Sequence, residues 1–118
     1  VIRTADLVID ALIGYSLQGA PRGPTAELIK LANRHAACIL ALDVPSGLDA
    51  TTGDTPGIAV EPHRTLTLAL PKTGLVQAPG DLYLADIGIP PEVYARLGLV
   101  VEPLWSNGYW FRLERKAR

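Results

Sequence analysis

Four short apolar segments, each followed at once by glycine or proline, constrain the fold of this chain more than any other feature. They span residues 6–13, 38–44, 65–70 and 82–89. In the first of them, residues 6–13, the apolar residues are nearly continuous, which is typical of a strand that is buried on both faces of a parallel sheet, and residues 38–44 are predicted to be a second buried strand. The glycine- and proline-rich stretches between them predict loops. The pattern therefore favours an α/β domain with a mostly parallel sheet.

A single crossover helix is predicted between the first two of these strands. Apolar residues recur at helical spacing over residues 24–36, and Pro24 suits the first turn of a helix. Pro90 and Pro91 open a second, shorter helix that is expected to end at about Leu97. The connection between the third and fourth strands is too short for another clear crossover helix.

The charge pattern excludes several classes of partner. The last seven residues hold four of the eleven basic groups and one of the twelve acidic groups, so residues 1–111 hold seven basic and eleven acidic groups. Such an acidic body is not typical of a nucleic-acid binder. No apolar run approaches the ~20 residues of a membrane-spanning helix, so no membrane partner is predicted. The single cysteine, Cys38, and the lack of a signal peptide predict a cytoplasmic location.

Polar residues capable of chemistry follow three of the predicted strands at the point where each strand ends. They are Asp10, Asp43, Ser46 and Lys72. Ligands of open parallel sheets bind beyond the carboxyl ends of the strands, so these side chains are expected to converge if the strands are adjacent. Each also has a purely structural interpretation, because the acids can cap loops, the serine can form a turn and the lysine can lie on the surface. The glycine-rich segment 14–23 can likewise be only a connecting loop.

Other common site signatures are absent from the sequence. It contains neither a G-x-G-x-x-G nor a G-x-x-x-x-G-K-[ST] phosphate-binding motif. The two histidines, His35 and His63, have no cysteine or acid at zinc-ligand spacing. No transition-metal site is therefore predicted.

Four stretches of the chain resemble the signatures of a known family. They read DLVIDALIGYSLQGAPRGP, LALDVPSGLDATTG, LALPKTG and LYLADIGIP, in that order between Asp6 and Pro91. In wording and order they are similar to the YjeF amino-terminal domain family, whose members are NAD(P)H-hydrate epimerases. The resemblance implies a Rossmann-like, three-layer α/β/α fold. It also implies an isomerase of nicotinamide nucleotide repair, which interconverts the R and S forms of hydrated NADH and NADPH (NADHX and NADPHX).

The resemblance also implies roles for individual residues. Asp10 and Ser46 would ligate a monovalent cation, usually potassium. Asp43 would bind the substrate directly, and Lys72 matches the lysine of the family's Pro-Lys-x-Gly segment. Beyond the resemblance, we expect Asp43 to act as acid and base at the C6 hydroxyl, with Lys72 in the catalytic group. The loop after the first strand would contact the substrate through Gly14, Tyr15, Ser16, Leu17, Gln18, Gly19 and Ala20. A dehydratase that repairs one epimer is the implied functional partner, and the dimers common in the family predict a homodimer.

The sequence departs from the family pattern in one large respect. The Asn-Asn-Gly-Gly-Asp-Gly loop of the family, which contacts the substrate phosphates, has no counterpart here. Residues 1–98 are therefore expected to be the second half of the domain, truncated at its amino-terminal side. Residues 99–118 are expected to be a carboxyl-terminal tail, with a turn at residues 106–108 that closes a hairpin.

Two alternatives to an ordinary epimerase stay open at this point. One is an inactive fragment or pseudoenzyme that serves as a nucleotide-binding or protein-interaction module. The other is a half-domain that pairs with a separate first-half chain. An upstream Asn-Asn-Gly-Gly-Asp-Gly segment, on the same polypeptide or on a neighbouring one, would discriminate between them.

Overall fold

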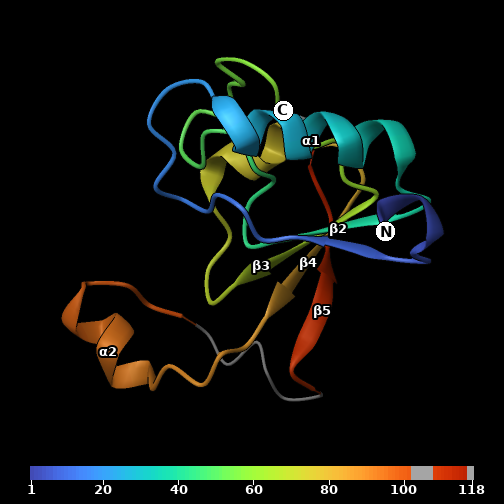
Figure 1. Ribbon diagram of the computed structural model, residues 1–118. Coiled ribbons are helices and arrows are strands. Elements are labelled where there is room, and N and C mark those ends of the chain that lie inside the picture. The colour runs from blue at the N-terminus through green and yellow to red at the C-terminus, as the bar shows by residue number, and fades with distance from the viewer. Residues whose placement is uncertain (102–107, 117–118) are drawn as a thin grey trace.

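Five strands form one open sheet in the computed structural model, which describes residues 1–101 and 108–116 (Figure 1). The strands lie in chain order, from β1 to β5, with the bounds Val8–Asp10, Ile39–Leu42, Arg64–Leu68, Asp81–Ala85 and Trp110–Leu113. The first four strands are parallel, and β5 pairs antiparallel with β4. The predicted α/β fold with a mostly parallel sheet is confirmed.

In the described residues, three of the four helical elements lie in the connections between strands. The crossover helix α1 (Gly23–His35) joins β1 to β2 and agrees with the predicted helix to within one residue. A short 3-10 helix, η2 (Thr73–Gln77), takes the place of a crossover helix between β3 and β4. α2 (Pro91–Arg96) follows β4, and η1 (Ile2–Thr4) precedes β1. In the described parts of the chain, no helix is long and apolar enough to cross a membrane.

The two faces of the sheet differ in burial. On the face beneath α1 and η2, the side chains of β2, β3 and β4 are nearly inaccessible to solvent; they belong to Ile39, Ala41, Thr65, Thr67, Leu82 and Leu84. The opposite face carries apolar side chains that stay partly or largely exposed, at Ile9, Leu40, Leu42, Leu66, Leu68, Tyr83 and Trp110. The expectation that the strands are buried on both faces therefore holds for one face only, because helical elements of the described residues cover one face.

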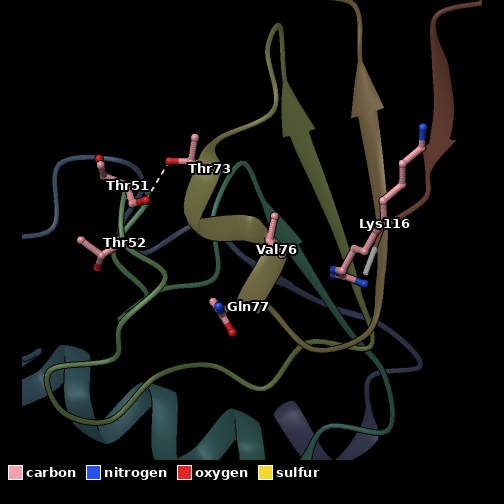
Figure 2. A pocket seen from close by; sticks show the side chains of 7 residues that line it. Thr51, Thr52, Thr73, Val76, Gln77 and Lys116 are labelled. Atoms are coloured by element: carbon pink, nitrogen blue, oxygen red, sulfur yellow. Dashed lines mark hydrogen bonds between the residues drawn. The ribbon is translucent and has the colours of Figure 1, made fainter. Parts of the chain in front are cut away.

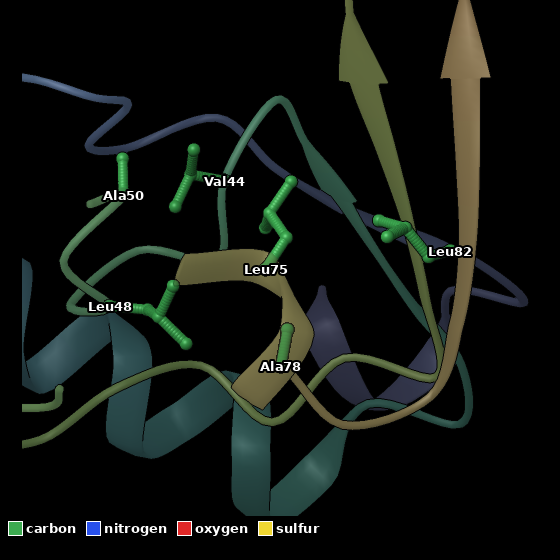
Figure 3. Packing of buried hydrophobic residues seen from close by; sticks show 6 residues of the cluster. All are labelled: Val44, Leu48, Ala50, Leu75, Ala78 and Leu82. Carbon is green, nitrogen blue, oxygen red and sulfur yellow. The ribbon is translucent and has the colours of Figure 1, made fainter. Parts of the chain in front are cut away.

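Two apolar clusters pack on the covered face. One joins α1 to β2 and consists of Ile29, Ala32, Ile39 and Val60. The other packs η2 and the loop after β2 against β4, and consists of Val44, Leu48, Ala50, Leu75, Ala78 and Leu82 (Figure 3). Full burial of a Val, Leu or Ile side chain stabilises a fold by about 1.5–3 kcal/mol. The clusters therefore fix the loops that follow β2 and β3.

The carboxyl-terminal residues add a strand to the sheet. In the antiparallel register, Leu84 lies opposite Phe111 and Leu82 opposite Leu113. Tyr83 and Trp110 contact edge to face, with ring centroids 5.7 Å apart. The other arm of the predicted hairpin and the first two residues of its turn, 106 and 107, lie outside the described residues.

Asp49 organises the loop after β2 and makes a pH-dependent contribution to stability. Its Oδ1 accepts the N–H groups of Thr52 and Thr51, both at 2.8 Å. These hydrogen bonds lower the pKa of the Asp49 carboxyl below its ordinary value. A depressed pKa stabilises the fold above the pKa of the unfolded chain, about 3.9, and this stabilisation is lost as the pH falls through the lower folded-state pKa.

Urea denaturation across a pH series should expose this contribution. Asp49→Ala is expected to be less stable than the wild-type chain near neutral pH. The difference in the free energy of unfolding should shrink below about pH 3.9, where the wild-type carboxyl becomes protonated. A difference that stays constant into the acid range would contradict the assignment.

Candidate active site

The polar residues predicted from the sequence lie at the carboxyl ends of three neighbouring strands. Asp10 is the last residue of β1, Asp43 directly follows β2, and Lys72 lies four residues after β3. Because β1, β2 and β3 are adjacent and parallel, their carboxyl ends meet at one edge of the sheet. The structure brings these residues together as two hydrogen-bonded pairs, Asp43 with Lys72 and Asp10 with Ser46.

Asp43 and Lys72 form an ion pair that is largely shielded from water. Lys72 Nζ lies 2.5 Å from Asp43 Oδ1, and the side chains of Lys72 and Asp43 are 22% and 17% exposed, respectively. The ammonium group also donates to Leu68 O at 2.8 Å and to Thr67 Oγ1 at 3.2 Å. Asp43 Oδ1 in turn accepts the Leu68 N–H at 3.1 Å and the Thr67 hydroxyl at 3.3 Å. The pair is therefore oriented by the end of β3.

The second carboxylate oxygen of Asp43, Oδ2, accepts no hydrogen bond from the described residues. It faces the start of the loop after β1, since a Cβ placed on Gly14 would lie 3.9 Å from it. Asp43 thus has one oxygen held by an amine, a hydroxyl and a backbone N–H, and one oxygen without a partner in the described structure. Such a carboxylate can exchange a proton with a molecule that lies between the strand ends and this loop.

The backbone around the ion pair is strained. Asp43 and Ala69 are the two described residues other than glycine with a positive φ, at 69° and 64°. Each is the centre of a γ-turn closed by an i→i+2 hydrogen bond, of 3.0 Å around Asp43 and 2.8 Å around Ala69. Such conformations cost about 1–3 kcal/mol each and concentrate at functional sites. The strain at the ends of β2 and β3 supports a functional role for the pair between them.

Asp10 and Ser46 form the second pair, which is fully buried. Asp10 is 4% exposed and Ser46 is 0% exposed. Ser46 donates its N–H to Asp10 Oδ2 at 2.8 Å and its hydroxyl to Asp10 Oδ1 at 2.6 Å. Across the described residues no cationic side chain pairs with Asp10, and no group of three or more His, Cys, Asp and Glu residues forms a metal cluster. Within that part of the chain, the charge of Asp10 is therefore balanced by hydrogen bonds alone.

Ile13 connects the two pairs through its backbone. Its N–H donates to Ser46 Oγ at 2.8 Å, and its carbonyl accepts the same hydroxyl at 3.3 Å. Gly14 comes next and lies beside Asp43. The site is consequently one continuous arrangement across β1, β2 and β3, and the loop of residues 14–20 begins beside Asp43.

Sequence reasoning misses two members of this arrangement, Thr67 and the backbone of Ile13. A signal for Thr67 was present, because threonine and leucine alternate over residues 65–68. In the structure Thr65 and Thr67 are 0% exposed beneath the helical elements, and the leucines lie on the opposite face. No comparable signal marks Ile13, because its contacts are made by the main chain.

Replacing Ser46 with alanine should destabilise the fold. The change removes the hydroxyl bond to Asp10 and leaves the Ile13 N–H without an acceptor. Unsatisfied buried polar groups cost about 1–3 kcal/mol each, so the free energy of unfolding should fall by about 2–4 kcal/mol. Urea denaturation measures the loss, and Ser16→Ala, in the exposed part of the loop after β1, is the matched control. Equal stabilities of the two variants would contradict this.

The fold and the two polar pairs define an α/β protein with a candidate ligand site at the carboxyl ends of its parallel strands. A family model described as "YjeF-related protein N-terminus" matches residues 1–74. The chain belongs to this family.

The names of similar proteins agree with membership of this family. The chain is 60% identical over 96 residues to the NAD(P)H-hydrate epimerase of Dehalogenimonas lykanthroporepellens, a match that covers 80% of this chain and 39% of that protein. It is 41% identical over 107 residues to the NAD(P)H-hydrate epimerase of Truepera radiovictrix, which covers 89% and 48% of the two chains. The Bifunctional NAD(P)H-hydrate repair enzyme Nnr of Escherichia coli is 41% identical over 91 residues, a match that covers 73% of this chain and 18% of that protein. The chain thus spans less than half the length of these relatives.

A solved structure supports the fold. The crystal structure of yeast ynu0, YNL200c, superposes with a TM-score of 0.74 at 21% sequence identity. The match covers 92% of this chain and 46% of the yeast chain. Nearly the whole fold of this chain therefore recurs within a chain about twice as long.

Proposed function

We propose that this chain carries the catalytic residues of an NAD(P)H-hydrate epimerase, an isomerase that interconverts the R and S forms of NADHX and NADPHX. Membership of the family and the names of the relatives support this activity. The observation that carries the proposal is the geometry of Asp43. One of its carboxylate oxygens is fixed by Lys72 and β3, and the other has no described partner beside the loop of residues 14–20.

Epimerisation at C6 of the hydrated ring needs a proton that is delivered and then taken back. Protonation of the C6 hydroxyl releases water and leaves a planar cation, which the lone pair of the ring nitrogen stabilises. Water then adds to either face and gives up a proton, so the reaction has no net proton change. Asp43 Oδ2 is proposed to exchange this proton, and Lys72 to hold the carboxylate in place and balance its charge.

The loop after β1 is proposed to bind the substrate. It is anchored through Ile13 to Ser46, and it begins next to Asp43. Its residues differ in exposure: Tyr15, Ser16, Gln18 and Gly19 are exposed, and Gly14, Leu17 and Ala20 are partly buried. A ligand lying on this loop would be in contact with Asp43 Oδ2.

Asp10 and Ser46 are proposed to hold a monovalent cation, potassium by the family pattern. The Asp10 carboxylate, the Ser46 hydroxyl and the Ile13 carbonyl bring hard oxygen atoms together within hydrogen-bond distance. Their chemistry fits the ion, because the buried charge of Asp10 has no cationic partner among the described residues. A bound cation would neutralise that charge and supply positive potential beside the substrate.

Exchange of potassium for lithium tests the cation. In the wild-type protein the exchange is expected to lower both the rate of epimerisation and the melting temperature, because a ligand of the native state stabilises it. Ser46→Ala removes one proposed ligand, so its melting temperature should respond less to the exchange. An equal response of the two proteins in differential scanning fluorimetry would contradict the assignment.

Residues 1–98 are proposed to form the second half of the family domain. β1 pairs with β2 on one side only, so its other edge is open in the described sheet. The uncovered face of the sheet displays Ile9, Leu42 and Trp110, which are 59%, 36% and 64% exposed. An open strand edge and an apolar sheet face are suited to further strands and a second helical layer.

The wider biology is proposed from the resemblance and the relatives' names. The name "Bifunctional NAD(P)H-hydrate repair enzyme" among the relatives supports a functional link to a dehydratase that acts on one epimer. A homodimer and a cytoplasmic location are proposed on the resemblance and on the single cysteine, Cys38.

An epimer-interconversion assay tests the proposed function. Pure S-NADHX or R-NADHX is incubated in potassium buffer with the chain alone, or with the chain co-expressed with the part of the Dehalogenimonas epimerase that it does not match. Chromatography then follows the second epimer. Interconversion faster than in buffer is expected for the co-expressed pair. If both samples are folded and neither exceeds the spontaneous rate, the proposal fails.

A further inference from the structure

A polar pocket lies outside the two pairs of the candidate active site. It has a volume of about 690 Å³ and lies between η2, the loop after β2 and the residues that follow β5. Figure 2 shows Val76 and Gln77 of η2 between threonine side chains on one side and Lys116 on the other. None of Asp10, Asp43, Ser46 and Lys72 lines this pocket.

The charged residues that line the pocket are both cationic. They are Arg115 and Lys116. Arg115 Nη1 donates to Gly80 O at 2.7 Å, and its Nε lies 3.4 Å from Leu75 O. These carbonyl groups fix the guanidinium without cancelling its charge. Lys116 forms no ion pair or hydrogen bond with the described residues, and no acid among them lines the pocket. The pocket therefore attracts an anion, although residues 1–111 carry an excess of acidic groups.

Hydroxyl and amide groups line the other side of the pocket. Thr73 Oγ1 donates to Thr51 O at 2.7 Å, which ties η2 to the loop after β2 (Figure 2). Thr52 Oγ1 accepts the Asp54 N–H at 3.1 Å, and the Thr52 side chain also hydrogen-bonds the Asp49 carboxylate, so Thr52 offers a ligand the remaining acceptor capacity of its hydroxyl oxygen. Gln77 adds an amide that can both donate and accept. These groups suit the hydroxyl and ring oxygens of a sugar.

We propose that this pocket binds a phosphate ester of a sugar, such as the ribose phosphate part of a nucleotide. The phosphate contacts Arg115 and Lys116, since the arginine fork matches phosphate oxygens. The sugar extends over Gln77 toward Thr52. The volume lies within the range of small-molecule sites, about 300–1,000 Å³. This ligand site is separate from the proposed epimerase site and does not depend on the proposed reaction.

Isothermal titration calorimetry on the full chain tests the proposal, with ribose 5-phosphate, ADP and inorganic pyrophosphate as probes. Lys116→Gln is the main variant, because Lys116 supports no other described contact. Loss of one charge-assisted contact should weaken ribose 5-phosphate binding about tenfold or more. Arg96→Gln, an exposed change on α2, is the matched control and should bind this probe as the wild type does.

The three probes separate the possible ligands. Thr52→Val should weaken ribose 5-phosphate and leave pyrophosphate unchanged. ADP binding that is as tight as or tighter than ribose 5-phosphate binding, with the same dependence on Lys116, supports a nucleotide as the source of the sugar phosphate. Pyrophosphate binding as tight as ribose 5-phosphate binding would overturn the sugar component. The proposal as a whole is overturned if ribose 5-phosphate does not bind at millimolar concentration, or binds Lys116→Gln and wild type equally.

Discussion

Asp43→Asn is expected to reduce the rate of NADHX epimerisation by about 10²- to 10⁴-fold, the usual contribution of a general acid–base group. The amide keeps an oxygen that can accept the hydrogen bonds from Lys72 and the Leu68 N–H, but it no longer exchanges a proton at the Oδ2 position. Asparagine also tolerates the left-handed backbone at this residue, where φ is 69°. The loss should therefore reflect the chemistry rather than a distorted turn.

The epimer-interconversion assay compares Asp43→Asn with Asp6→Asn, which makes the same chemical change at an exposed acid ahead of β1. Substrate binding should stay measurable in Asp43→Asn, and circular dichroism should show that it is folded at the assay temperature. Asp6→Asn should retain the wild-type rate. Wild-type turnover by folded Asp43→Asn would remove Asp43 from the proposed mechanism.

The positions of the candidate site residues were predictable, but their hydrogen-bond partners were not. An acid or an amine just after an apolar strand can be recognised in a sequence, and the parallel sheet then places Asp10, Asp43 and Lys72 at one edge. The pairing depends on how the chain turns after each strand. The γ-turn at Asp43 directs its carboxylate to β3 and Lys72, and no residue type in the sequence marks that turn.

The end of β1 illustrates a limit of the apolar pattern. Its apolar run covers residues 6–13, but the strand ends at Asp10. Past that point the backbone N–H groups of Leu12 and Ile13 donate to the side chains of Asp10 and Ser46 instead of to a neighbouring strand. The apolar residues continue past Asp10, but the pairing of β1 with β2 stops there, and the main chain contacts the candidate site instead. A strand boundary of this kind depends on contacts 33 residues away in the chain, between Ile13 and Ser46.

Two features of the sheet depend on long-range packing and were missed for that reason. The first is the pairing of β5 with β4. It was missed because β4 ends at Ala85, 25 residues before β5 begins, and because the residues of β5 mix aromatic and basic types. The exposure of one sheet face was also unforeseen, because an apolar residue in a strand does not reveal whether any layer covers it. The leucines of β3 lie on the uncovered face and its threonines on the covered one, which reverses the usual order. That reversal supports the proposal, made above, that this chain is half of a larger domain whose second helical layer covers the leucines.

Gly47→Ala is expected to lower the free energy of unfolding by more than about 3 kcal/mol, because backbone strain and steric overlap act together at this position. Gly47 has a φ of 95°, and a Cβ there would lie 2.3 Å from Ile58 O and 2.7 Å from Ala59 Cα. The left-handed backbone alone costs an alanine about 1–2 kcal/mol. The overlap adds to this cost, because both close atoms belong to the main chain.

The neighbouring segment cannot move aside cheaply, since two hydrogen bonds hold it. The Val60 N–H donates to Ser46 O at 2.8 Å, and Asn33 Nδ2 donates to Ala59 O at 2.9 Å. Gly88→Ala is the matched control, because Gly88 also has a positive φ, of 77°, but no described atom within 4 Å of the added Cβ. Urea denaturation should give a loss of about 1–2 kcal/mol for the control and a clearly larger one for Gly47→Ala. Since Ser46 adjoins Gly47, displacement of this loop should also weaken the hydrogen bonds between Ser46 and Asp10. Equal losses in the free energy of unfolding of the two variants would show that the close packing over Gly47 contributes nothing.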